Sequence, residues 1–291
     1  MAAFYHAIQG FHNQLFDYFF IFISFCGSAP VYILLLMALF WNVDKRFGFR
    51  LTLLLLISMS INDLLKNWFR TPRPIGQAGI RSIYLSSAGG YSFPSGHSQG
   101  AATFYPYLWR RWPSPILKAA GTTAILLIGF SRLYLGVHWP GDVLGGYLFG
   151  LMIVSAFQHL DERLFKLTWP FPVKLALAVL IPLLFLAVYH SQEGWQLVGF
   201  TAGFSCGYFL EDHILDYRER TGWRTSVRKT LLGFAVLGLW ALPWLPLAKF
   251  HSWLYLPILA VGGLWASFGA PYVFRRLGWE QTNLRKNKET S

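Results

Sequence analysis

Charged residues are scarce in this chain: only 13% of its 291 residues are Asp, Glu, Lys or Arg, whereas 54% are hydrophobic. The mean hydropathy is +0.40. These values separate the chain from soluble globular proteins and are typical of a chain that crosses a membrane several times. We therefore expect a membrane protein.

Acidic residues and cysteines are scarcer still. The 13 acidic residues do not balance the 25 basic ones, which leaves a net charge of +12. The basic residues cluster between apolar runs, as in the loops of a membrane protein, so we expect no nucleic acid partner. The two cysteines, Cys26 and Cys206, form no CxxC pair and have no spacing suited to a metal. The sequence predicts neither a metal site nor a cofactor.

The apolar runs predict an all-α fold, a polytopic transmembrane helical bundle. We count about nine spans, all helical because a bilayer leaves no unpaired backbone group tolerable. An aromatic stretch at residues 5–26 precedes them and predicts an N-terminal interfacial helix, with a tilted first span as the alternative. The spans are expected at residues 30–41, 51–68, 97–109, 116–135, 142–160, 173–189, 195–214, 231–247 and 253–274.

The basic residues predict the orientation of these spans. Nine spans place 19 of the 25 basic residues, with the carboxy terminus, on one face. By the positive-inside rule that face is cytoplasmic. The opposite face keeps six, and three of these, Lys66, Arg73 and Arg132, belong to polar clusters. Those clusters are therefore expected on the non-cytoplasmic side of the membrane.

A connector at residues 161–172, which is charged and then proline-rich, is the one candidate domain boundary in the chain. It predicts a core at residues 1–160 that holds the polar clusters. Residues 161–291 then form a carboxy-terminal block of four additional helices and a basic cytoplasmic tail. We expect this block to shape lipid access or packing between the subunits of a homo-oligomer. Its acidic residues are expected to pair with charges at the interface; they are Glu211, Asp212 and Asp216.

Two polar clusters interrupt the apolar sequence before residue 100. Lys66 and Arg73 lie at the end of a predicted helix, where a cation pair at a membrane boundary would also explain them. The second cluster reads Pro-Ser-Gly-His at residues 94–97. Its Ser95 and Gly96 open a helix, so free N–H groups and the positive helix end form a cradle for an anion. An ordinary capped helix start explains the second cluster equally well.

The third cluster contains Arg132, His138 and Asp142. The planar guanidinium of Arg132 matches two phosphate oxygens. His138 and Asp142 are four residues apart, which is about one helical turn, and a carboxylate beside an imidazole fixes its tautomer. Together with His97, the clusters supply what a phosphoryl-transfer site needs when it has no metal. We interpret the chain as a membrane phosphatase.

The three clusters resemble the signature of the type 2 phosphatidic acid phosphatase superfamily, which includes vanadium haloperoxidases and glucose 6-phosphatase. The signature reads KxxxxxxRP, PSGH and SRxxxxxHxxxD, and this chain matches it without substitution at residues 66–74, 94–97 and 131–142. The resemblance covers about residues 10–160. It implies a helical-bundle phosphatase that needs no metal.

The resemblance also implies a role for each matching residue. His138 would attack phosphorus, Asp142 would orient His138, and His97 would protonate the leaving oxygen. The residues that would hold the phosphate are Lys66, Arg73, Ser95, Gly96 and Arg132.

Two other classes of function compete with this interpretation. A vanadate-dependent peroxidase would reuse the same pocket, but such relatives are soluble. A membrane transporter or channel would explain the helices and the intramembrane acidic groups, but not three phosphate-binding clusters on one face.

A lipid phosphate or diphosphate substrate is expected, because its tail can stay in the bilayer. Undecaprenyl diphosphate is the first choice; phosphatidic acid, phosphatidylglycerol phosphate and sphingoid phosphates remain open. The expected location is a cell membrane, as a multi-pass protein of a bacterial inner membrane.

Overall fold

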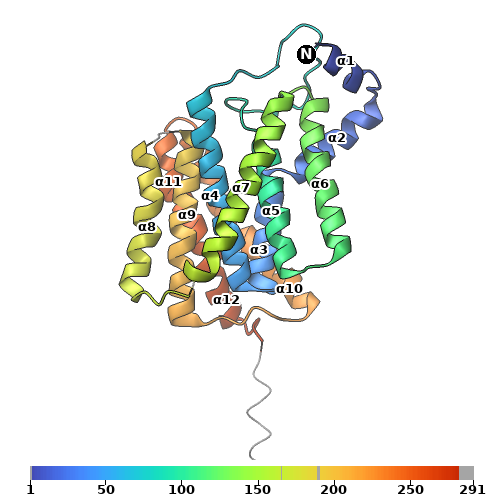
Figure 1. The fold of residues 1–291 in the computed structure, drawn as a ribbon. Coiled ribbons are helices and arrows are strands. Elements are labelled where there is room, and N and C mark those ends of the chain that lie inside the picture. Colours follow the sequence, from blue (N-terminus) through green and yellow to red (C-terminus); the bar gives the residue numbers. More distant parts are fainter. Residues whose placement is uncertain (1, 165, 189–190, 282–291) are drawn as a thin grey trace, which may run out of the picture. The chain divides into compact units, whose positions relative to one another are not determined.

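The computed structural model describes residues 2–164, 166–188 and 191–281, and every regular element within these ranges is helical (Figure 1). The predicted all-α fold is confirmed. The end of the predicted span at residue 189 and the basic tail lie outside the described residues. The α-helices are α1 (Ala2–Gln9), α2 (Gln14–Cys26), α3 (Ala29–Asn42), α4 (Lys45–Phe69), α5 (Gly96–Arg111), α6 (Pro115–Tyr134), α7 (Pro140–Leu164), α8 (Phe171–Val188), α9 (Gln192–Leu210), α10 (Trp223–Ala248), α11 (Tyr255–Leu264) and α12 (Ala270–Arg276). Single turns are η1 (Leu85–Ser87), η2 (Glu211–Leu215), η3 (Ser252–Leu254) and η4 (Trp265–Gly269).

Several helices have the length and composition of membrane spans. Within the described ranges, four segments are long and apolar enough to cross a bilayer. They are Lys45–Phe69, Pro115–Tyr134, Pro140–Asp161 and Ser252–Arg276. A fifth arises if α2 and α3, which bend by 47° at their junction, count as one span. The expected count of nine is not confirmed.

The amino-terminal segment differs from the single interfacial helix predicted at residues 5–26. It forms two helices, α1 and α2, with a break between Gln9 and Gln14. The Asn13 side chain accepts a hydrogen bond from the Phe16 N–H at 2.9 Å, which makes Asn13 the amino-terminal cap of α2. A cap of this kind starts a new helix and explains the break.

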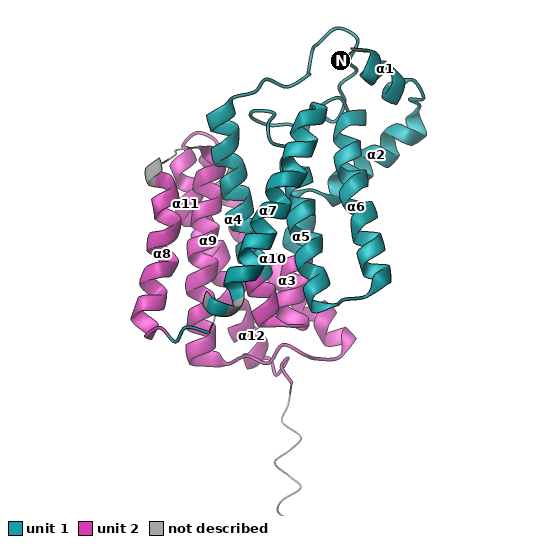
Figure 2. Ribbon diagram, in the orientation of Figure 1, with its two compact units in different colours: residues 1–34, 51–168 teal, residues 35–50, 169–291 magenta. Residues whose placement is uncertain are grey.

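The chain forms two compact units, shown in Figure 2. Unit 1 comprises residues 1–34 and 51–168, and unit 2 comprises residues 35–50 and 169–291. In unit 1, α5 packs along α6 and α7. The α4 residues Ser58 and Asn62 are hydrogen bonded to α5, to Thr103 at 2.9 Å and to Gln99 at 2.8 Å respectively. These hydrogen bonds hold the first half of α5 beside the second half of α4.

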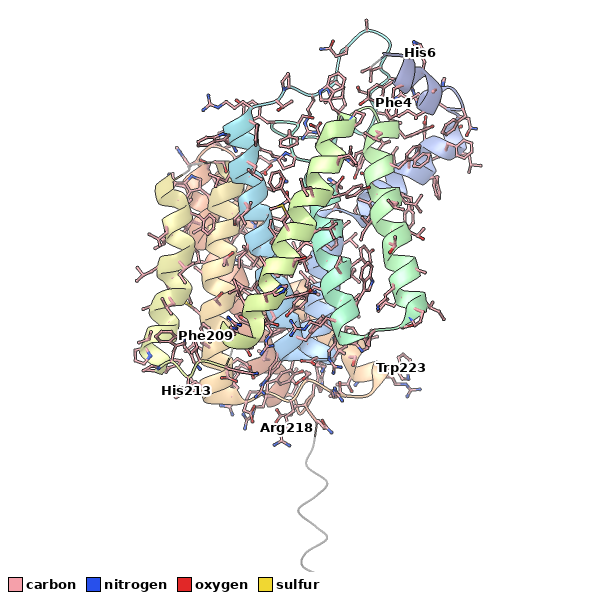
Figure 3. The ribbon with its side chains drawn as sticks, viewed as in Figure 1. Phe4, His6, Phe209, His213, Arg218 and Trp223 are labelled. Carbon is pink, nitrogen blue, oxygen red and sulfur yellow. The ribbon has the colours of Figure 1, made fainter. Side chains whose placement is uncertain are left out.

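Unit 2 is built on α9, which packs against α8 and α11. A Cβ at Gly203 would lie 1.9 Å from the Ala260 carbonyl oxygen, so glycine allows the two backbones to touch. At one end of α9, the ring of His213, labelled in Figure 3, stacks on Phe171 at 4.2 Å. Close backbone contact and ring stacking thus hold the helices of this unit together.

A buried ion pair within unit 2 explains why α4 begins at Lys45 rather than at residue 51. The Lys45 Nζ lies 2.9 Å from the Glu211 Oε1, and the two side chains are 7% and 0% exposed. Lys45 also lies 3.3 Å from Asp216. The Asp44 carboxylate accepts the Phe47 N–H at 2.9 Å and caps the helix. Residues expected in a loop therefore form the first turns of α4.

Candidate active site

The three polar clusters lie together in unit 1, although they are separate in sequence. The Ser95 N–H donates to the Asp142 carbonyl oxygen at 2.9 Å, which joins the second cluster to the third. The Trp139 indole N–H donates to the Pro72 carbonyl oxygen at 2.9 Å, which joins the third cluster to the first. The end of α4, the start of α5 and the turn between α6 and α7 therefore meet at one place.

His138 lies in the turn between α6 and α7, and it and Asp142 are each only 2% exposed. The His138 Nδ1 lies 3.4 Å from the Asp142 Oδ2, and the His138 Nε2 lies 2.9 Å from the Arg73 Nη1. Because a guanidinium only donates, Nε2 is the acceptor and the ring proton lies on Nδ1, toward the carboxylate. The lone pair of Nε2 therefore faces a cation.

The electrostatic surroundings of His138 favour the neutral ring. Burial lowers the pKa of the imidazole well below its usual value, and the positive charges of Arg73, Arg132 and Lys66 lower it further. A lowered pKa keeps the ring unprotonated at neutral and mildly acidic pH. The neutral imidazole is the form that can attack an electrophile.

The Asp142 carboxylate is held by two further groups. Its Oδ2 accepts the Trp139 N–H at 2.7 Å and the Ser92 hydroxyl. The Ser92 Oγ also lies 3.4 Å from the His138 Nδ1, and the Ser92 side chain is fully buried. Ser92 is absent from the sequence prediction because it is uncharged and lies outside the three motifs. Its place shortly before the second motif is the only signal that could have identified it.

Arg73 is held beside His138 by backbone carbonyl groups. Its Nη1 donates to the Val137 carbonyl oxygen at 2.8 Å, and its Nε donates to the Gly90 carbonyl oxygen at 3.0 Å. Its Nη2 donates to the Gly89 carbonyl oxygen at 2.6 Å. These contacts tie the loop before α5 to the turn that carries His138. They orient the guanidinium with one Nη group toward the imidazole.

Arg132 is fully buried in the last turn of α6. Its Nη1 donates to the Ser24 hydroxyl and, at 3.0 Å, to the Ser87 hydroxyl, and its Nη2 donates to the Ser87 carbonyl oxygen at 3.0 Å. Among the described residues, the buried Arg132 Nε has no hydrogen-bond partner. A buried guanidinium with an open donor is suited to hold an anion.

Ser95 and Gly96 form the start of α5, as predicted. Ser95 is the amino-terminal cap, and its Oγ accepts the Ser98 N–H at 3.4 Å and the Ser98 hydroxyl at 3.0 Å. A Cβ at Gly96 would lie 3.3 Å from the Asn62 Oδ1, so a larger residue would crowd α4. The N–H groups of the first turn point out of the end of the helix and give this end a positive potential.

His97 and Lys66 complete the set of predicted site residues. The His97 Nε2 is buried, and no described residue forms a hydrogen bond with it. The charges of Arg132, Lys66 and Arg73 act on the His97 ring, and the same three act on His138. Lys66 lies in the last turn of α4 and is 8% exposed. The structure thus brings the predicted site residues together in one positively charged environment, in which they are buried or half-buried.

Two family models match this chain. The model described as PAP2 superfamily matches residues 47–166, which contain all three clusters. A second model, described as PAP2 superfamily phosphatase, transmembrane extension, matches residues 195–282. The chain belongs to the PAP2 superfamily. The second match assigns residues 195–282 to a transmembrane extension of PAP2 superfamily phosphatases, and this segment contains none of the three clusters.

Three curated proteins illustrate what this PAP2 chain is similar to. Phosphatidylglycerophosphatase B of Bacillus subtilis is 36% identical over 114 residues, which are 36% of this chain and 53% of the relative. Sphingosine-1-phosphate phosphatase 1 of Mus musculus is 26% identical over 200 residues, or 62% and 45% of the two chains. Undecaprenyl-diphosphatase of Sulfolobus acidocaldarius is 28% identical over 142 residues, or 46% and 65%. The chain spans about half the length of the first two relatives.

Close packing between α5 and α7 sets the position of the start of α5 and gives a first prediction. A Cβ at Gly146 would lie 2.7 Å from the Ser95 carbonyl oxygen and 3.1 Å from the Gln99 N, both of which are backbone atoms. Gly146→Ala must therefore displace the start of α5. We expect kcat/KM for phosphate release to fall about tenfold, since small displacements of reacting groups are costly.

Gly141→Ala is the matched control, because a Cβ at Gly141 meets nothing within 4 Å. Both variants add one methyl group to the same helix. Equal kcat/KM values for the two variants would contradict the expectation that activity depends on the position of the start of α5.

Proposed function

We propose that this protein is an integral membrane phosphatase that hydrolyses a lipid phosphate or diphosphate through a phosphohistidine intermediate, without a metal. The supporting observation is the arrangement of His138, with Nδ1 toward Asp142 and Nε2 toward Arg73. The similarity to proteins named as lipid phosphatases supports the substrate class.

In the first step the His138 Nε2 attacks phosphorus, and the bond from phosphorus to the leaving oxygen breaks. Asp142 holds the Nδ1 proton and stabilises the positive charge that develops on the ring. His97 gives a proton to the leaving oxygen, which departs as an alcohol or, for a diphosphate, as a monophosphate. The phosphate oxygens are bound by Lys66, Arg73, Arg132 and the start of α5, where Ser95 and Gly96 lie.

In the second step water attacks the phosphohistidine. His97, now unprotonated, takes a proton from the water, the bond between Nε2 and phosphorus breaks, and inorganic phosphate leaves. His138 and His97 return to their initial protonation states. Three fixed cations balance the charge of the transition state, which is the role that a metal ion has in other phosphatases.

Undecaprenyl diphosphate is the first choice of substrate, because the site is proposed to face outward, where that carrier is released. The test is phosphate release by the purified protein in detergent from undecaprenyl diphosphate, phosphatidic acid, phosphatidylglycerol phosphate and sphingosine phosphate. We expect release from at least one lipid. Activity should be unchanged in EDTA, and vanadate should inhibit competitively because it adopts a five-coordinate form resembling the transition state.

Two results would contradict this function. The first is an absolute requirement for a divalent ion. The second is the absence of phosphate release from all four lipids; ion flux by the same protein in reconstituted vesicles would then favour a transporter.

We further propose that the chain has about nine spans, a cytoplasmic carboxy terminus and a site on the non-cytoplasmic face of a bacterial inner membrane. The distribution of basic residues supports this orientation. It can be tested with single cysteines in a variant that lacks Cys26 and Cys206. The suitable positions are Ser86, which is exposed in η1, and Ser114, which is exposed at the start of α6. The neighbouring Ser87 is unsuitable because it binds Arg132.

An impermeant thiol reagent applied to intact cells is expected to label Ser86→Cys and to leave Ser114→Cys unmodified. Permeabilised cells provide the control, because both positions should then react. Labelling of Ser114→Cys alone in intact cells would invert the orientation and place the site in the cytoplasm.

A further inference from the structure

The amino-terminal helix α1 reaches the catalytic turn. The Tyr5 hydroxyl donates to the His138 carbonyl oxygen at 2.6 Å, and the Tyr5 side chain is fully buried. The Tyr5 ring packs edge-on against Trp139 at 6.1 Å and against Phe4, labelled on α1 in Figure 3, at 5.5 Å. Neighbouring rings therefore fix the direction of the hydroxyl group.

The acceptor of Tyr5 belongs to a peptide group that also holds the catalytic carboxylate. The carbonyl of His138 and the N–H of Trp139 are the two ends of one planar peptide unit. The Trp139 N–H donates to the Asp142 Oδ2 at 2.7 Å. Tyr5 fixes one end of this unit and Asp142 accepts from the other. Loss of the Tyr5 hydroxyl would let the unit rotate and would weaken the orientation of Asp142 toward the imidazole.

The second helix, α2, reaches the buried arginine. The Ser24 hydroxyl accepts from the Arg132 Nη1, and Ser24 is fully buried. Ser24 and Ser87 together fix the plane of the guanidinium. That plane decides where the open Nε donor of Arg132 is directed.

Further contacts show that α1 and α2 are firmly attached to this end of unit 1. The Gln9 amide donates to the Arg81 carbonyl oxygen at 2.7 Å and to the Tyr134 carbonyl oxygen at 2.8 Å. Asp17 forms an ion pair with Arg81 and accepts from the Tyr134 hydroxyl at 2.8 Å. The Phe20 ring lies 4.2 Å from that of Tyr134. Tyr5 and Ser24 are thus placed by a set of contacts and not by one.

We infer that α1 and α2 are part of the catalytic apparatus, in which Tyr5 is a positioning residue for His138 and Ser24 is a positioning residue for Arg132. This inference rests on the proposed phosphatase function. It assigns the two residues different kinetic effects. Tyr5 acts on the nucleophile, whose orientation matters in the transition state. Ser24 acts on a group that binds phosphate in both the ground state and the transition state.

The test uses Tyr5→Phe and Ser24→Ala in the full chain, with phosphate release measured on the lipid that the wild-type protein hydrolyses. Tyr5→Phe is expected to lower kcat about tenfold with little change in KM, and Ser24→Ala is expected to raise KM and the inhibition constant of vanadate about tenfold with a smaller change in kcat. Rates are compared per amount of folded protein, and a thermal unfolding curve of each variant gives that amount.

The chain offers a control for each substitution. Tyr18→Phe removes an exposed tyrosine hydroxyl from α2. Ser28→Ala removes a buried hydroxyl that has no hydrogen-bond partner among the described residues. Both controls should keep the wild-type kcat and KM.

The outcomes separate the inference from the proposed function. An active wild-type protein with Tyr5→Phe and Ser24→Ala equal to their controls would overturn the inference and leave the function intact. A parallel loss of kcat in both variants, without the split between kcat and KM, would show a purely structural role and would also overturn it. If one variant fails to fold, the other decides the question alone. An inactive wild-type protein would contradict the function itself.

Discussion

His138→Ala is expected to lose turnover of every phosphate ester, by about 10⁴-fold or more, whether the leaving group is good or poor. The reason is that, in the proposed mechanism, the His138 Nε2 forms the one new bond to phosphorus in the first step. The measurement is phosphate release from a lipid phosphate and from p-nitrophenyl phosphate.

His97→Ala is the companion variant, and its loss should depend on the leaving group. A general acid contributes only when the departing oxygen needs a proton, so we expect a loss of about 100-fold on a lipid phosphate ester and a smaller loss on p-nitrophenyl phosphate. Phosphate trapped on His138 from the activated ester would support the same assignment. Equal losses on both substrates would contradict it. Rescue of His138→Ala by the better leaving group would mean that the two roles are reversed.

Glu211→Gln is expected to destabilise the protein by about 3 kcal/mol, because it leaves the buried Lys45 ammonium without its buried partner. The exposed Asp216 carboxylate, at 3.3 Å from Lys45, offsets only part of this loss. Turnover of the folded protein should stay within about tenfold of wild type, since Glu211 belongs to unit 2, where it binds the Lys45 ammonium and the Tyr217 N–H. The measurement is the midpoint of thermal unfolding in detergent, together with phosphate release.

Asp212→Asn is the control for this variant, because it makes the same chemical change at an exposed neighbour. The same unfolding midpoint for both variants would show that the buried pair contributes little. A loss of turnover comparable to that of His138→Ala would instead mean that the carboxy-terminal block takes part in catalysis.

Local sequence patterns predicted the helices but not all of their ends. Apolar runs and the Ser-Gly step identify α5 and α6 to within a few residues, because a membrane helix follows from composition alone. The helix α4 starts earlier than the apolar run at residues 51–68 predicts, because the charge of Lys45 indicates a loop. Asp44 is the sequence signal for the earlier start, since an acidic residue before a helix often caps it. That Lys45 is buried depends on Glu211, which lies 166 residues further on.

The candidate site likewise contains residues that the sequence identifies and residues that only the structure identifies. His138, Asp142 and Arg132 could be chosen from sequence because their side chains have few reasons to occur together in an apolar chain. Tyr5 and Ser24 could not, because each is one of many similar residues. Only the folded chain shows that Tyr5 lies against His138 and Ser24 against Arg132.

The hydrogen bond from Tyr5 to His138 also sets an order of events during synthesis. The two residues are 133 positions apart. At ribosomal rates of about 5–20 residues per second, Tyr5 leaves the ribosome on the order of 10 s before His138 is made. The Tyr5 hydroxyl in α1 therefore cannot form this hydrogen bond until His138, which follows α6, has been translated. A fusion tag at the amino terminus would be present next to Tyr5 throughout that interval, so a tag for purification belongs at the other end of the chain.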